Sequence, residues 1–137
     1  MKRAIGIMAV ALSLFMFTTA ISAFAVGSDY SVLRSTNYSY ANAVLNISAG
    51  EATATGIMQG IPGVTTKITV HLYLQQYKDG KWVDYDDWTK SENSTYVTLT
   101  PKLSVPKGYT YRAKASCYAY AGSKSEHVIK YSSEVKY

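Results

Sequence analysis

The chain has only one cysteine, Cys117, among its 137 residues. It therefore cannot form an internal disulfide, and a folded domain must be held together by the burial of apolar side chains. It also lacks a basic stripe, because its 14 basic and 9 acidic residues are interspersed. A concentrated basic surface is the usual mark of a nucleic-acid-binding protein. We therefore expect no nucleic-acid partner.

Signatures of catalysis and of metal binding are missing as well. His71 and His127 are the two histidines, and neither stands near a G-x-S-x-G nucleophile motif. Asp84, Asp86 and Asp87 lack the spacing of a calcium loop and have no second acidic cluster to work with. We predict a non-enzymatic protein without cofactor or metal. A small extracellular hydrolase that uses this aspartate cluster stays open as an alternative.

The first 25 residues have the three parts of a secretory signal peptide, which we expect to be helical. Lys2 and Arg3 give a positive start, residues 5–17 form an uncharged apolar core, and a small-x-small cleavage site ends at Ala25. We predict export and secretion, with contact to a membrane only during export. An uncleaved membrane anchor remains the alternative, since the apolar run is just long enough to span a bilayer.

The composition after this leader is that of a folded globule. The whole chain is 47% hydrophobic and 17% charged, values that argue against disorder. Thirteen Tyr stand beside three Phe and two Trp. Aromatic surface is thus carried mainly by rings with a polar tip, which suits half-buried strands and wet binding faces equally.

Period-two alternation of apolar and polar residues organises the exported part. We predict an N-terminal arm over residues 26–42 and a β-sandwich domain over residues 43–137, with about seven strands in two antiparallel sheets. The predicted strands cover residues 43–49, 51–59, 67–78, 81–88, 95–100, 109–121 and 126–137. The fold class is therefore all-β, preceded by a signal peptide.

Two of these strands define the expected interior. Leu72 and Leu74 belong to an alternating set of large apolar residues. Within residues 109–121 the odd positions hold two tyrosines and then, from Ala113 onward, only small apolar residues. Cys117 is in phase with this small set, so we interpret it as a core residue and not as a reactive thiol.

Residues 67–88 read as a β-hairpin that turns at Asp79-Gly80. A two-residue turn places Tyr77 opposite Trp82 and Leu74 opposite Tyr85, and it leaves Trp88 on the outer face. A three-residue loop with a bulge would shift the pairing by one residue and carry aspartates to the Leu side. We prefer the first register, because burying unpaired carboxylates is costly.

Several segments resemble known proteins. The leader, ISAGEATATG, YLQQYKDGKW and KGYTYRAKA together resemble small secreted proteins of Gram-positive bacteria that have no assigned function. The GYTYR segment is similar to the start of the sixth strand in immunoglobulin-like and fibronectin type III domains, where a Tyr packs at the sheet corner. The resemblance implies an immunoglobulin-like sandwich, although the Cys-to-Cys bridge of antibody domains is absent. It supplies no catalytic residues.

The candidate binding surface is the outer face of one sheet. If residues 109–121 pair beside residues 67–77, aromatic and basic side chains gather there, and such patches commonly bind sugars or proteins. The predicted ligand-binding residues are His71, Tyr73, Tyr77, Trp82, Trp88, Arg112, Tyr118 and Tyr120. The predicted partner is an extracellular glycan, a cell-wall polymer or a protein. A structural or envelope-assembly module without a ligand is the alternative.

Overall fold

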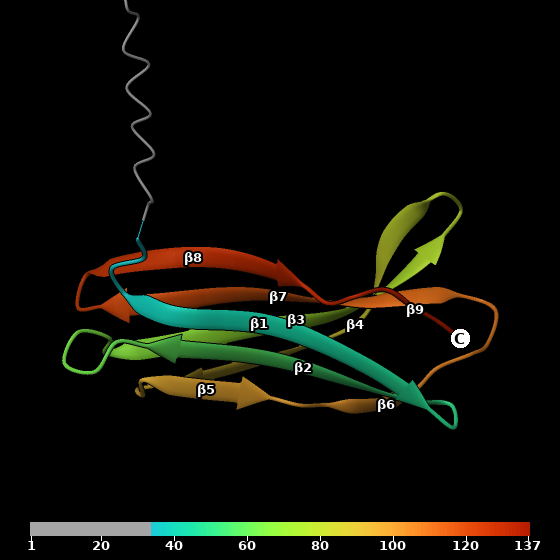
Figure 1. Cartoon of the computed structure of the whole chain (residues 1–137), viewed down its shortest axis with the longest axis horizontal. Helices are drawn as coiled ribbons and strands as arrows, with labels where there is room; N and C mark the ends of the chain where they lie inside the picture. Colours follow the sequence, from blue (N-terminus) through green and yellow to red (C-terminus); the bar gives the residue numbers. More distant parts are fainter. Residues whose placement is uncertain (1–33) are drawn as a thin grey trace, which may run out of the picture. The chain divides into compact units, whose positions relative to one another are not determined.

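A computed structural model describes residues 34–137 of the chain (Figure 1). The predicted signal peptide and residues 26–33 lie outside the described residues. The described part contains nine strands: β1 (Tyr38–Ser48), β2 (Glu51–Gly60), β3 (Lys67–Lys78), β4 (Lys81–Glu92), β5 (Tyr96–Leu99), β6 (Lys102–Ser104), β7 (Thr110–Ala121), β8 (Lys124–Tyr131) and β9 (Val135–Lys136). No helix that could cross a membrane is found within residues 34–137.

The strands form two antiparallel sheets. The first has the order β1-β2-β5, and β6 also pairs with β2. The second has the order β4-β3-β7-β8, and β9 pairs with β7. The predicted all-β, two-sheet antiparallel sandwich is confirmed. The strand predicted over residues 126–137 is divided into β8 and β9, and β6 is an additional strand whose three residues are too few to show a clear period.

The core lies between the two sheets and is built largely from small residues. Leu72, Leu74 and Cys117 are fully buried, as predicted, together with three alanines of β7, Ala113, Ala115 and Ala119. Gly56 on β2 faces them so closely that an added Cβ would lie 2.9 Å from Cγ1 of Val70. The sheets therefore approach each other most closely where the sequence places alanine and glycine, and larger residues fill the space on either side.

Tyr111 at the start of β7 joins the core to the loop that precedes the strand. Its ring is fully buried, and its hydroxyl donates a 2.7 Å hydrogen bond to the backbone oxygen of Pro106. The same hydroxyl accepts a 3.1 Å hydrogen bond from Nε2 of Gln76, a buried residue of β3. Tyr111 of the GYTYR segment thus links the start of β7 to the preceding loop and to β3.

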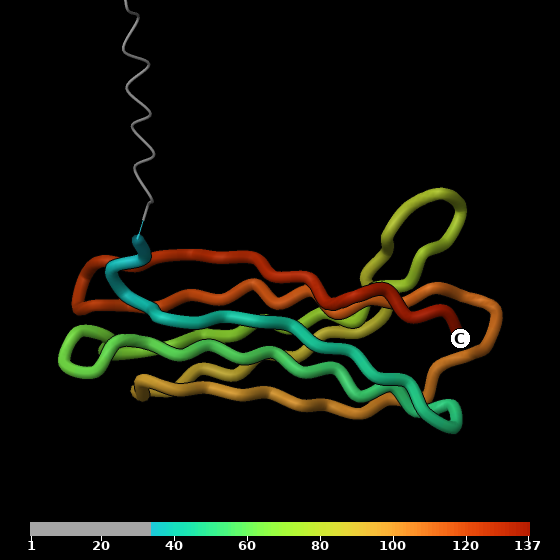
Figure 2. Tube along the Cα trace, in the orientation of Figure 1, coloured from blue at the N-terminus to red at the C-terminus, as the bar shows by residue number. Residues whose placement is uncertain are grey.

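The β3–β4 hairpin turns at Asp79 and Gly80, which have φ values of 52° and 78°. Two successive positive φ angles are those of a two-residue type I′ turn. Tyr77 pairs with Trp82, as predicted. Figure 2 shows this hairpin tip bending away from the remaining strands.

The predicted register is wrong beyond the tip of this hairpin. β4 carries a bulge at Tyr85, so Leu74 pairs with Asp86 and Leu72 pairs with Trp88. The extra residue reverses the alternation for the rest of β4. Asp86 then lies on the Leu side, but it remains exposed because β4 is an edge strand. The expected cost of burying a carboxylate is therefore not incurred.

The first strand begins inside the segment that was predicted as an arm. β1 starts at Tyr38, which packs against the core, and Tyr40 is exposed on the β1-β2-β5 sheet. Glu126 of β8 holds this start: its carboxylate accepts hydrogen bonds from the backbone N–H groups of Thr36 (2.8 Å) and Asn37 (2.9 Å). Neither tyrosine covers the outer face of the second sheet.

Candidate functional site

The outer face of the β4-β3-β7-β8 sheet gathers most of the predicted binding residues. Because the even positions of β3 and the odd positions of β7 are buried, the alternate positions point outward. We call this surface the aromatic face. It comprises Lys67, His71, Tyr73, Tyr77, Trp82, Arg112, Lys114, Tyr118, Tyr120, His127 and Tyr131.

Trp88 does not belong to this surface, and its prediction as an outward residue is wrong. The bulge at Tyr85 places Trp88 opposite Leu72, and the ring packs against the core. The same bulge separates the aspartates. Asp84 and Asp87 pair with outward residues of β3, whereas Asp86 pairs with Leu74. The cluster that a hydrolase would need is thus split between the two sides of β4.

Arg112 ties the hairpin tip to the sheet. Its guanidinium carbon lies 4.2 Å from the ring centroid of Trp82 and 4.3 Å from that of Tyr131. Nε of Arg112 donates a 2.8 Å hydrogen bond to Oε1 of Gln75, whose Nε2 donates at 2.8 Å to Asp84. Cation–π contact with two rings and a hydrogen-bonded chain hold the guanidinium in one place.

Two lysines repeat this arrangement farther along the aromatic face. The ammonium of Lys114 lies 5.2 Å from the centroid of Tyr73, and that of Lys67 lies 5.4 Å from the centroid of Tyr120. Such distances are those of cation–π pairs. Each of the three cations on this face is therefore placed over at least one aromatic ring.

Tyr118 lies at the centre of an imidazole and phenol cluster. The His127 ring stacks on it at a centroid distance of 4.3 Å, and the His71 ring meets it edge-on at 5.9 Å. Both imidazoles are hydrogen-bonded to hydroxyls, His71 to Thr89 (2.8 Å) and His127 to Ser116 (2.7 Å).

The contact between Ser116 and His127 joins a hydroxyl to a base, as nucleophilic catalysis requires. A serine hydrolase also needs an acid that orients the other ring nitrogen. Within residues 34–137 no acid is hydrogen-bonded to His127. This part of the chain also contains no group of three side chains arranged to hold a metal ion.

Sequence reasoning missed Lys67, His127 and Tyr131 as members of the aromatic face. The two β8 residues lie opposite Tyr118 and Lys114 of β7, so they share the outward side. The alternation within residues 126–137 puts His127 and Tyr131 on the same side of their strand. Only the pairing of β8 with β7 shows that this side is the outward one.

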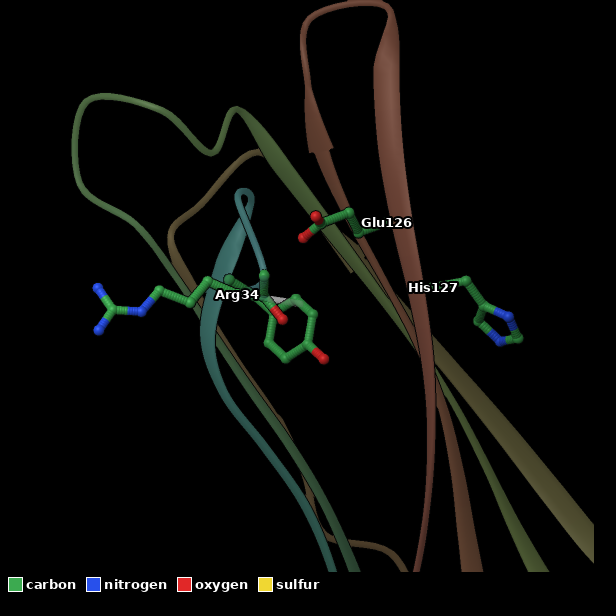
Figure 3. Close-up of a pocket in the computed structure, with 5 residues that line it drawn as sticks. Arg34, Glu126 and His127 are labelled. Carbon is green, nitrogen blue, oxygen red and sulfur yellow. The ribbon is translucent and has the colours of Figure 1, made fainter. Parts of the chain in front are cut away.

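Two depressions lie near this surface. One, of about 430 Å³, is lined by Tyr77, Trp82, Thr110 and Glu134 at the hairpin tip. The other, of about 340 Å³, is lined by Arg34, Ser35, Tyr38, Glu126 and His127. Figure 3 shows that His127 lies on the opposite side of β8 from Glu126, and that Arg34 extends away from both. The second depression therefore brings no reactive groups together.

Cys117 contributes to no site. It is fully buried, and burial raises the pKa of its thiol to about 11. The thiolate is the reactive form, so this thiol is unreactive at neutral pH while the domain is folded.

Comparison with known proteins identifies no family. No family model matches the chain, and no curated protein matches it. The solution structure of R. palustris CsgH is similar at a TM-score of 0.42 and 13% sequence identity, over 66% of this chain and 87% of that one.

Proposed function

We propose that this chain is a secreted, non-enzymatic, immunoglobulin-like β-sandwich that binds an extracellular glycan or cell-wall polymer through the aromatic face. The main support for this proposal is the row of outward rings on one sheet, with polar and basic groups between them. The rings include those of Tyr73, Tyr77, Trp82, Tyr118 and Tyr120. Flat rings stack on the apolar faces of sugars, while neighbouring donors bind hydroxyl and anionic groups.

Support for secretion comes from the sequence. Residues 1–25 have the charged start, apolar core and cleavage site of a signal peptide. A domain that leaves the cell also needs to be stable without chaperones, and the fully buried core supports this without a disulfide.

Support for an immunoglobulin-like fold comes from topology. The strand orders β1-β2-β5 and β4-β3-β7-β8 correspond to a sandwich in which strands A, B and E face strands C′, C, F and G. β7 then takes the place of strand F, and Tyr111 is hydrogen-bonded to a backbone oxygen five residues upstream, as in a tyrosine corner.

A structural role without a ligand is the second candidate. It is favoured by the contacts within the aromatic face, where Arg112, Lys114 and Lys67 already lie over rings of the same chain. These pairs stabilise the sheet by themselves, and a module for envelope assembly would need nothing more from them.

The two candidates are separated by a binding assay on the protein expressed as the 137-residue chain. Glycan arrays and pulldown with insoluble cell-wall material would be compared for the parent and a Tyr73→Ala, Trp82→Ala, Tyr118→Ala triple variant. The matched control is Tyr40→Ala with Tyr96→Ala, which removes exposed rings from the opposite sheet. Urea unfolding of each variant reports whether it is folded.

We expect the parent and the control to bind and the triple variant, still folded, to lose binding. Absence of binding by the folded parent would favour the structural role. Equal loss in the control would show that the aromatic face is not the site.

A further inference from the structure

The cations of the aromatic face keep most of their hydrogen-bond donors free. Arg112 uses Nε for Gln75, and no acceptor within residues 34–137 is hydrogen-bonded to its terminal nitrogens. The ammonium groups of Lys67 and Lys114 have neither a hydrogen bond nor an ion pair in the same part of the chain. Each cation is thus oriented by a ring while its donors remain available to an anion.

The acidic groups near this face lie on the edge strand β4 and, with Glu134, at the hairpin tip. Asp84 and Asp87 point outward from the edge strand β4. The outward residues of β7 and β8 include no acid: they are Thr110, Arg112, Lys114, Ser116, Tyr118, Tyr120, Ser125, His127, Ile129 and Tyr131. The half of the face formed by β7 and β8 is therefore suited to negative charge, and the β4 edge repels it.

The basic groups are spread along the sheet. Arg112 and Lys114 are two residues apart on β7, which separates them by about 7 Å at the rise of an antiparallel strand. Lys67 lies opposite Tyr120, eight residues from Arg112. The row therefore extends over about 27 Å, with aromatic rings between its ends. A small anion would meet one cation, whereas a chain with repeated charges would meet all three.

We propose that the ligand of this face is a polymer with repeated anionic groups, which lies along β7 with its sugar or polyol units on the rings and its phosphates or carboxylates at Arg112, Lys114 and Lys67. This inference rests on the proposed function and adds the charge and the direction of the ligand. Charge complementarity selects an anionic polymer over a neutral one, and the acid-free β7–β8 half determines its path.

The test uses four probes with the protein expressed as the 137-residue chain. Poly(glycerol phosphate) and polygalacturonate supply phosphate and carboxylate polymers, dextran is neutral, and a thymidine oligonucleotide represents single-stranded nucleic acid. The variant is Lys67→Gln with Lys114→Gln, which removes the charge and keeps a polar, unbranched side chain at both positions. The matched control is Lys102→Gln with Lys107→Gln, which removes the same charge away from this face.

We expect at least one anionic polymer to bind, with an affinity about tenfold lower in the Lys67 and Lys114 variant, from roughly a few-fold for each exposed charge pair. The control should keep the parent affinity, and binding should weaken as salt screens the charges. The stronger of the two anionic probes identifies phosphate or carboxylate as the preferred group.

Equal affinity for dextran, or an equal loss in the control, would overturn the anionic assignment and leave the proposed function standing. Tighter binding of the oligonucleotide would replace the polymer by a nucleic acid. No binding of any probe by the folded parent would overturn this inference, and the wall pulldown described above would then decide the proposed function separately.

Discussion

Removal of one oxygen atom at the sheet corner should destabilise the whole domain. The Tyr111→Phe substitution keeps the buried ring and deletes the hydroxyl that bridges Pro106 and Gln76. Pro106 is exposed, so its backbone oxygen can turn to water and the loss there is small. Gln76 is 6% exposed, so its amide group loses an acceptor that water cannot easily replace.

The two losses set the expected magnitude. The bond to Pro106 contributes about 1 kcal/mol, and an unsatisfied buried donor costs about 1–3 kcal/mol. We therefore expect Tyr111→Phe to lower the free energy of unfolding by about 2–4 kcal/mol, which corresponds to a fall in Tm of roughly 10 to 30 °C for a domain of this size.

Urea unfolding followed by tryptophan fluorescence measures this change as a shift of the midpoint at constant m-value. Tyr85→Phe is the matched control, because the Tyr85 ring packs edge-on against Tyr111 but is 41% exposed. We expect the control to lie within about 0.5 kcal/mol of the parent.

A second substitution tests which of the two lost hydrogen bonds causes the destabilisation. If the orphaned amide of Gln76 carries most of the cost, Gln76→Leu should recover stability in the Tyr111→Phe background, since two apolar partners can replace a buried polar pair. A Tyr111→Phe protein as stable as the parent would refute the role of the corner hydroxyl. Strictly additive losses in the double variant would refute the role of Gln76.

Three further predictions concern a turn, a thiol and a carboxylate. Ala49 has a φ of 49°, so Ala49→Gly should raise the free energy of unfolding by about 0.5–1 kcal/mol in urea titrations; a lower midpoint would contradict this. Cys117 should react with an aromatic disulfide reagent only as urea unfolds the domain, because burial raises its pKa to about 11; prompt reaction without urea would contradict its burial. The pKa of Glu126 is lowered, first by the backbone N–H of Thr36. Its stabilisation is therefore present above its ordinary pKa and is lost as the pH falls through the lowered value. Hydrogen-exchange protection at Thr36 and Asn37 should accordingly decrease in acid. Glu126→Gln should reduce this protection at neutral pH and change it little in acid, where the parent carboxyl group is already neutral; protection equal to that of the parent at neutral pH would show that the carboxylate does not hold this segment.

Alternation alone determined much of this protein. Leu72 and Leu74 on β3 and the small residues of β7 reveal their buried side through a period of two, because successive side chains on a strand point to opposite faces. Asp79-Gly80 predicts its own turn, since both residues tolerate positive φ. The inward and outward sides of β3 and β7, and with them most of the aromatic face, follow from these local properties.

Tertiary structure decided the rest. The bulge at Tyr85 leaves no mark in the alternation of β4, an edge strand whose two sides are both largely polar, and so the sequence could not place Trp88. The contact of Arg112 with Trp82 and Tyr131 joins β4 to β7 and β8, although β5 and β6 separate β4 from these two strands in the chain. Local patterning specifies which side of a strand is apolar, but only pairing between strands determines which side chains meet.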